Sequence, residues 1–292
     1  MYKSWRGLAF FLLLCPLPAA AQTGLLIVAH GANAEWNGQV RETVAQVRWT
    51  AGPTAVAFLM GAEAKSSGWA RGVEQLVAQG ARSIVVVPLM VSSHGSHYRQ
   101  IRFYAGELDQ LPPELKAHHH GPDGPPPVPM RVTPALDAAP ELQEAVALRW
   151  SGLEPRLRSA PLVLLGHGPT EDSDALRWTA AFETALARVR ALGHQQESRP
   201  ALMRDDAPPP ERARAIAKMR DTVTALAARS GDSVTVMTIL IAQGQMTRAR
   251  IPRDLDGLPV RYAPMGLTPL PAIARWIERV AGELVNGADA GH

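Results

Sequence analysis

Three histidines in the first half of the chain have the residue type and spacing of a transition-metal site. His30 directly follows one short apolar run, and His94 and His97 follow another, with only a glycine and a serine between them. A neutral imidazole binds divalent cobalt, iron, nickel or zinc, and the same nitrogen can accept a proton. A single histidine after a strand is more often a hydrogen-bonding group than a ligand. The histidines therefore predict a metal site only if the fold brings them together.

Short apolar runs alternate with stretches of helical spacing, which indicates an α/β fold with a mostly parallel sheet. Ligands of such sheets bind at the carboxyl ends of the strands. His30 lies after the first predicted strand, and His94 and His97 lie after the third, so we expect all three at one edge of the sheet. His94 could instead only hydrogen-bond its loop. The strands predicted in the first half are residues 25–29, 55–59, 83–89 and 130–134.

Local features around these histidines also predict how they are held. A helix that begins near Ser96 would place His97 in its first turn, where the positive helix end favours the neutral, metal-binding imidazole. Gly31 and Gly95 are expected in tight strand-to-helix turns that let the backbone approach a ligand.

The second half of the chain repeats the order of the first, at residues 161–169, 234–246 and 260–280. We therefore predict two similar domains, residues 22–153 and 154–292, each a parallel sheet flanked by helices, with a cleft between them. A general likeness of any two α/β halves is the competing explanation. His167 keeps the place of His30, but His94-Gly-Ser-His97 becomes Gln-Gly-Gln-Met, residues 243–246, and amides are poor metal ligands. The first half is thus predicted to hold the active site and the second a degenerate copy.

Residues 1–21 have the layout of a secretory signal peptide, with a basic start, an apolar stretch and a small-residue end. Cleavage after Ala21 would export the mature chain to the periplasm and remove Cys15, the only cysteine, so disulfides and thiolate metal sites are not expected. The apolar stretch is short for a membrane span, and no stable membrane insertion is expected after cleavage. An uncleaved anchor is the alternative.

Composition narrows the function further. Hydrophobic residues make up 46% of the chain and charged residues 20%, which is the balance of a folded protein. The net charge is only +3 and no Lys/Arg run occurs, so nucleic acid is not an expected partner. P-loop, dinucleotide and G-x-S-x-G motifs are missing from the sequence, which gives no support for a nucleotide cofactor or a hydrolase. A Pro- and His-rich insert, residues 111–129, carries His118, His119 and His120, which could capture a metal ion or belong to a solvated loop.

The segments AHGA (29–32), AFL (57–59), GARSIVVVPL (80–89) and HGSH (94–97) resemble the class II tetrapyrrole chelatases of the CbiX type. The resemblance extends from residue 25 to about 285 and is to the long, internally duplicated form. It implies ATP-independent insertion of a divalent metal into a sirohydrochlorin-like tetrapyrrole, with Co²⁺ favoured and Fe²⁺ or Ni²⁺ as alternatives. The resemblance thus implies a cobaltochelatase-like lyase, for which the metal is a substrate. The resemblance puts the two active-site histidines at His30 and His97, with His94 as a further candidate metal ligand.

Two departures from the family pattern bear on catalysis. Met60 stands where the family usually has a glutamate after its second strand, although Glu63 is close by, and Gln100-Ile-Arg replaces the family's Asp-Ile-Pro. In the mechanism that the resemblance suggests, His30 and His97 hold the metal and accept the pyrrole protons. Exposed arginines would meet the carboxylates of the tetrapyrrole, the candidates being Arg99, Arg102, Arg248 and Arg250. A non-enzymatic periplasmic protein that binds metal or tetrapyrrole is the alternative, favoured by the signal peptide, Met60 and the His-rich insert.

Overall fold

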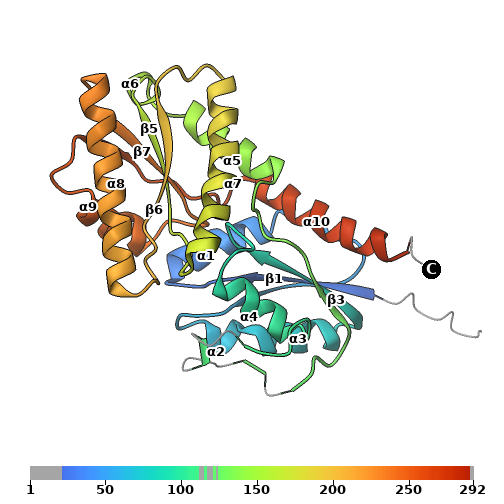
Figure 1. Ribbon diagram of the computed structural model, residues 1–292. Helices are drawn as coiled ribbons and strands as arrows, with labels where there is room; N and C mark the ends of the chain where they lie inside the picture. Colours follow the sequence, from blue (N-terminus) through green and yellow to red (C-terminus); the bar gives the residue numbers. More distant parts are fainter. Residues whose placement is uncertain (1–21, 112–114, 117–120, 123, 290–292) are drawn as a thin grey trace, which may run out of the picture.

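The computed structural model describes residues 22–111, 115–116, 121–122 and 124–289. The predicted signal peptide and the three consecutive histidines of the insert lie outside the described residues. Within them, each half of the chain forms a four-stranded parallel sheet flanked by helices (Figure 1). The predicted fold class, α/β with two similar domains, is therefore confirmed.

The first sheet has the strand order β2-β1-β3-β4, with every neighbouring pair parallel. All four strands predicted from the sequence in this half are present. The elements are β1 (Gln22–Ala29), α1 (Ala34–Val44), β2 (Thr54–Phe58), α2 (Ala64–Ser67), α3 (Trp69–Ala78), β3 (Ala81–Leu89), α4 (Ser96–Tyr104), β4 (Met130–Val132), α5 (Pro140–Ser151) and α6 (Pro155–Arg158).

The second sheet has the equivalent order, β6-β5-β7-β8, again parallel throughout. Strand β6 was not predicted, because its sequence SRPAL contains a proline and no continuous apolar run, which suits only an edge strand. The elements are β5 (Leu162–Gly166), α7 (Asp172–Ala191), β6 (Ser198–Leu202), α8 (Pro209–Ser230), β7 (Val234–Ile239), the π-helix η2 (Met246–Arg250), α9 (Ile251–Asp254), β8 (Val260–Ala263) and α10 (Pro271–Asp289).

The central strands are apolar on both faces, as a sheet covered on both sides requires. In β1, Leu25 and Ile27 belong to one buried cluster, whereas Leu26 and Val28 belong to another on the opposite face. Helices α3 and α4 cover the second of these faces. Local signals agree with this layout: the side chain of Asn33 caps α1, and α5 and α8 begin at prolines, whose fixed φ suits a first turn.

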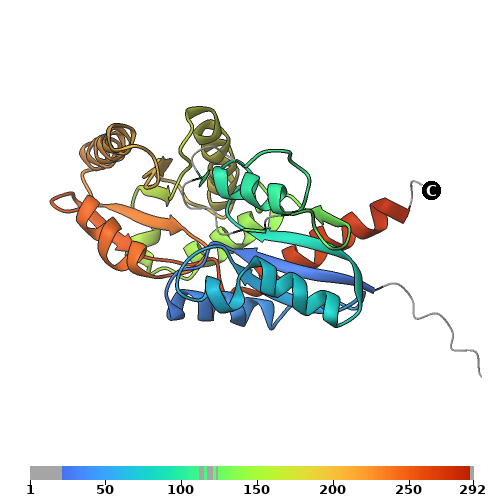
Figure 2. The same ribbon diagram turned by 90° about the horizontal axis from the view of Figure 1, so that it is seen from below.

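Helices are exchanged between the two halves. Helix α10, the last of the second half, packs against β3 and α1 of the first, and α5 of the first half packs against α7 of the second. Figures 1 and 2 both show α10 extending over the strands of the first sheet. Trp276 and Ile277 of α10 are fully buried in the same cluster as Ile27 and Val87. A single core therefore joins the two sheets.

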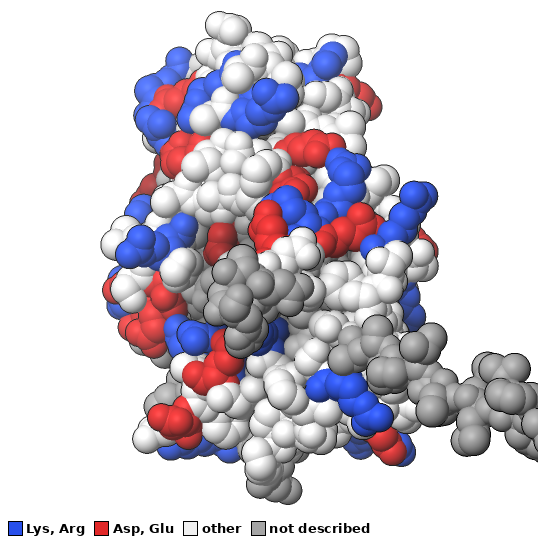
Figure 3. All heavy atoms as spheres, turned by 90° about the vertical axis from the view of Figure 1, so that its right-hand side faces the viewer, with Lys and Arg blue, Asp and Glu red and all other residues white. Residues whose placement is uncertain are grey.

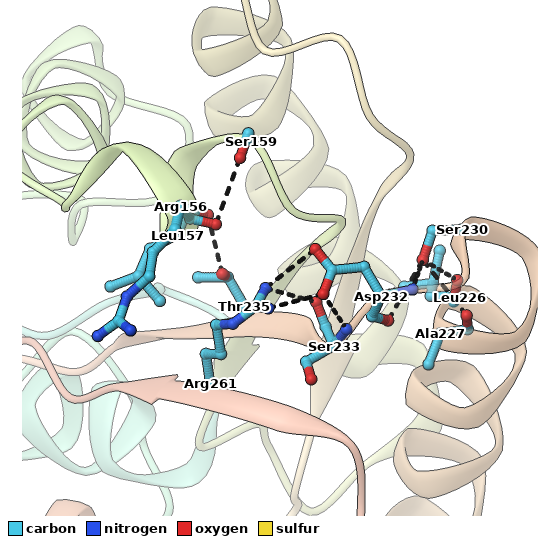
Figure 4. A network of polar contacts seen from close by, with 10 residues as sticks. All are labelled: Arg156, Leu157, Ser159, Leu226, Ala227, Ser230, Asp232, Ser233, Thr235 and Arg261. Carbon is cyan, nitrogen blue, oxygen red and sulfur yellow. Dashed lines mark hydrogen bonds and ion pairs between the residues drawn. The ribbon is translucent and has the colours of Figure 1, made fainter.

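His167 lies at the carboxyl ends of the strands of the second sheet. A network of polar contacts stabilises the opposite end of this sheet. Arg261 of β8 donates to Asp232, just before β7, at 2.6 Å, and the hydroxyl of Thr235 donates to the carbonyl of Leu157 at 2.8 Å (Figure 4). The hydroxyl of Ser230, at the end of α8, donates to the carbonyl of Leu226. This network fixes the amino ends of β7 and β8 to α6 and α8.

The surface carries charges of both signs. On the face drawn in Figure 3, basic and acidic side chains are interspersed, in keeping with the small net charge. No helix within the described part of the chain combines the length and the apolar character that crossing a membrane requires.

Candidate metal centre

His30 and His97 meet at the carboxyl ends of neighbouring strands. Ala29, the last residue of β1, pairs with Leu89, the last residue of β3, so the loops that follow the two strands start side by side. His97 lies in the first turn of α4, which begins at Ser96 as predicted. The two imidazole centroids are 4.9 Å apart with their planes at 79°. The structure thus brings these two predicted residues together, while their role as metal ligands stays a prediction.

Hydrogen bonds fix the same tautomer in both rings. His30 Nδ1 lies 2.8 Å from the carbonyl oxygen of Gly31, which can only accept, so Nδ1 carries the proton. His97 Nδ1 lies 3.1 Å from Gln100 Oε1, and the amide nitrogen of Gln100 donates to the Tyr104 hydroxyl at 2.7 Å. In each ring the lone pair is therefore on Nε2. A donated bond from the other ring nitrogen is the arrangement found in histidines that bind metals.

The protonation of His30 follows from its surroundings. Burial, and secondarily the charge of His97 beside it, lower the pKa of His30 to about 4. His30 is accordingly neutral at pH 7, and its Nε2 lone pair is available to a cation.

The turn after β1 requires a glycine. Gly31 has a φ of +85°, and a Cβ at this position would collide with the carbonyl oxygen of Met60. Met60 N in turn donates to the carbonyl of His30 at 2.8 Å. The expectation for Gly95 was wrong, because its backbone is extended, with φ 169°, and a Cβ there would meet nothing within 4 Å.

The ring of His94 is directed to the second half of the chain. Its Nδ1 is 4.0 Å from Asp174 Oδ1 on α7, and Asp174 also accepts a 2.9 Å bond from Arg99. The backbone carbonyl of His94 accepts a 2.6 Å bond from Trp178 Nε1, also on α7. His94 therefore contributes to the contact between the halves, and its predicted role as a ligand has no geometric support comparable to that of His97.

The counterpart of this contact lies on α1. Gln39 Oε1 accepts from the backbone N of Gln243, and Gln39 Nε2 donates to the carbonyl of Gln243, both at 3.0 Å. Arg248 forms an ion pair with Glu35 of α1. The two contacts are therefore equivalent. Helix α7 of the second half holds the loop after β3, and helix α1 of the first half holds the loop after β7.

The described part of the first half places no glutamate beside His30. Met60 occupies the expected place and its side chain is 43% exposed. Glu63 is paired with Arg41, whose hydrogen bond holds the pKa of that carboxyl below its usual value. The carboxylate of Glu63 is therefore committed to Arg41.

In the second half, by contrast, carboxylates lie close to a histidine, in a segment that was not predicted to contribute to a site. Asp205 and Asp206 follow β6, and His167 Nε2 is 3.6 Å from Asp206 Oδ2. The charges of His167 and Asp206 both act on His30. The signal was present in the sequence as Arg-Asp-Asp, residues 204–206, but was not recognised because the strand before it was not predicted.

The four arginines expected to meet substrate carboxylates all have protein partners. Each forms an ion pair in the structure, so a substrate would have to share or displace a carboxylate already bound. The pairs are Arg99–Asp174, Arg102–Glu107, Arg248–Glu35 and Arg250–Asp205.

Comparison with known proteins agrees with this fold. Residues 24–152 match the CbiX family model. The chain is similar to SirB from Bacillus subtilis with Fe³⁺, with 19% identity, a TM-score of 0.59 and coverage of 92% of this chain and 98% of that one. It is also similar to the sirohydrochlorin chelatase SirB from Bacillus subtilis subspecies spizizenii in complex with cobalt (17%, TM-score 0.60, coverage 92% and 98%). CbiX, the terminal enzyme for biosynthesis of siroheme in denitrifying bacteria, matches with 15% identity, a TM-score of 0.51 and coverage of 92% and 99%.

No curated protein matches the chain. The similarity to these solved structures shows a chelatase-like fold with two similar domains. The half that matches the CbiX family model, residues 24–152, is the half that contains His30 and His97.

Proposed function

We propose that this protein inserts a divalent metal ion into a sirohydrochlorin-like tetrapyrrole without ATP. The observation that carries the proposal is the contact of the His30 and His97 rings, whose centroids are 4.9 Å apart and whose Nε2 lone pairs are available, within the residues that match the CbiX family model. The similarity to SirB, whose structures hold Fe³⁺ or cobalt, supports a transition metal as the substrate. Co²⁺ is the first candidate, with Fe²⁺ and Ni²⁺ as alternatives.

Insertion exchanges one divalent ion for two pyrrole N–H protons. In the proposed reaction, Nε2 of His30 and of His97 hold the ion above the macrocycle, which is placed between the two halves. As the ion moves to the pyrrole nitrogens, the freed imidazole nitrogens can accept the released protons. A pKa of about 4 makes His30 a weak proton acceptor at neutral pH, so we assign it chiefly to holding the metal.

The test is an anaerobic absorbance assay with sirohydrochlorin and Co²⁺, repeated with Fe²⁺ and Ni²⁺. The variants His30→Ala and His97→Ala are expected to lower the insertion rate at least a hundredfold, and His94→Ala to lower it less than either. Asp232→Asn, in the network at the amino end of β7, serves as a control at the opposite end of the strands from the histidines. Unchanged rates in both His30→Ala and His97→Ala would overturn the proposed roles.

A second function is favoured by Met60, which leaves His30 without the family's glutamate. A protein with this site could bind metal or tetrapyrrole without turnover. The same assay separates the two: catalytic turnover supports the chelatase, whereas stoichiometric binding that saturates supports the binding protein.

We also propose that the protein is exported and that its mature chain begins at Gln22. The layout of residues 1–21, with small residues up to Ala21, supports this proposal.

A further inference from the structure

The second half contains a histidine and a carboxylate that face each other without a hydrogen bond. His167 Nδ1 lies 2.9 Å from the carbonyl oxygen of Gly168, which can only accept, so Nδ1 carries a proton. Nε2 then faces Asp206 Oδ2 at 3.6 Å, a distance too long for a hydrogen bond. A lone pair and a carboxylate oxygen repel each other unless a second proton or a cation lies between them.

The separation fits two ligands of one metal ion. Metal bonds to histidine nitrogen and carboxylate oxygen are about 2.0–2.2 Å long, and two such bonds at an angle of about 90–120° put the ligand atoms about 3.0–3.6 Å apart. His167, Asp205 and Asp206 each offer a donor atom, and all three atoms lie within 4.8 Å of one another.

The three residues do not contribute equally. Asp205 has a side chain only 2% exposed, and it is paired with both Arg212 and Arg250. Two guanidinium groups already satisfy its oxygens, so Asp205 holds the loop in place. The side chain of Asp206 is 53% exposed, which leaves its oxygens accessible to an ion and its remaining water ligands.

The loop that carries Asp206 is fastened to the loop that carries His167. Arg204 N donates to the carbonyl of His167 at 2.6 Å, and Arg204 Nε donates to the carbonyl of Pro169 at 3.1 Å. Arg204 also pairs with Asp172 and adopts a φ of +53°, which is uncommon for a residue with a side chain. The ligand pair is thus held in place before any ion arrives, which lowers the cost of binding.

We propose that His167 and Asp206 form a second site for a divalent transition-metal ion, separate from the His30–His97 pair. One imidazole and one carboxylate suit ions such as Co²⁺, Ni²⁺, Fe²⁺ or Zn²⁺. The site is on the same side of the molecule as His30, since the charges of both residues act on that histidine. The proposal does not depend on chelatase activity, because a metal site without turnover satisfies it.

The test is titration of the metal-free full chain with Co²⁺ alone, followed by calorimetry and by visible absorption. His167→Gln and Asp206→Asn are each expected to remove one bound ion per chain, or to weaken one binding step at least tenfold. A variant with both His30→Ala and His97→Ala is expected to lose the ion of the other site. The triple variant that also carries His167→Gln is expected to lose both ions. Asp232→Asn, whose carboxylate has similar exposure at the far end of the sheet, should bind as the wild type does.

Two outcomes would overturn the proposal. Unchanged stoichiometry and affinity in both His167→Gln and Asp206→Asn would show that the pair is an imidazolium–carboxylate contact with a proton in place of the metal. Loss of one and the same ion in the His167 and His30 variants, with no further loss on combining them, would show a single shared site. Circular dichroism controls for folding, and Asp206→Asn is a mild change at an exposed side chain. The insertion assay is independent of both outcomes.

Discussion

Trp178 Nε1 donates a 2.6 Å hydrogen bond to the backbone carbonyl of His94. Trp178 belongs to α7 of the second half, whereas His94 lies in the loop that leads to His97. Because α7 fixes the backbone three residues before His97, the second half helps to position a histidine of the first. The second half therefore affects the candidate metal centre in two ways. Trp178 fixes the backbone before His97, and the charges of side chains of the second half act on His30.

Trp178→Phe should weaken Co²⁺ binding at His97 several-fold, because it removes this hydrogen bond to the loop that leads to His97. The loss is expected to cost about 1 kcal/mol of unfolding free energy, in the range for one hydrogen bond. Trp276→Phe is the matched control, since the buried Nε1 of Trp276 has no hydrogen-bond partner within the described structure. Urea unfolding and Co²⁺ titration check both variants. Equal effects on metal binding would contradict the positioning role.

Stability of the metal-free protein should fall as the pH drops from 6.5 to 4. The pKa of His30 is about 4 in the folded chain and 6.5 ordinarily, so in this window the unfolded chain binds a proton that the folded chain does not. The stabilisation from the neutral ring is complete above pH 6.5 and is lost by pH 4, up to about 3 kcal/mol. His30→Asn should therefore lose less stability than the wild type between pH 7 and 4.5. Urea unfolding at the two pH values measures this, and equal losses would contradict it.

Met60→Glu should strengthen Co²⁺ binding on the order of tenfold, about 1.4 kcal/mol, because it adds a carboxylate next to His30. Met60 is partly exposed and bonds His30 through its backbone, so the substitution leaves that bond in place. If the missing glutamate limits catalysis, the insertion rate should rise as well. Glu63→Gln is the control and should change neither quantity, since Glu63 is committed to Arg41. A Met60→Glu variant with wild-type affinity would show that position 60 does not reach the ion.

The exported protein should begin at Gln22. Expression of the full chain in a bacterial host, followed by intact mass measurement of the periplasmic fraction, checks this. Ala21→Lys should block cleavage, because signal peptidase requires a small residue there. Full-length protein that stays in the cytoplasm would contradict the proposed localisation.

The sequence predicted the candidate site correctly where a histidine directly follows a clearly apolar strand. Strand runs such as residues 83–89 are apolar throughout, and a histidine after each of two such strands predicted the meeting of His30 and His97 correctly. Asp206 was missed because β6 has no apolar run of its own and is recognised as a strand only by its pairing with β5. Gly95 was expected in a tight strand-to-helix turn from its residue type and place, and the backbone there proved to be extended.

The sequence could not show which sheet a helix would cover. The apolar side chains of α10 predict burial, but periodicity is the same whether the helix packs on its own sheet or on the other. The exchange of α5 and α10 depends on the complementary shapes of both halves, and ion pairs such as Arg279–Glu141 and Arg275–Glu144 connect the two helices.

The position of α10 has a consequence for how the protein folds. A fragment that ends near residue 153 would lack α10, so the face of β1 and β3 that carries Ile27 and Val87 would lose part of its apolar cover. The two halves are thus obligate folding partners and should unfold in a single cooperative transition. The second copy cannot be deleted even where its own loop has lost the histidines, because the first copy has no complete hydrophobic interior without it.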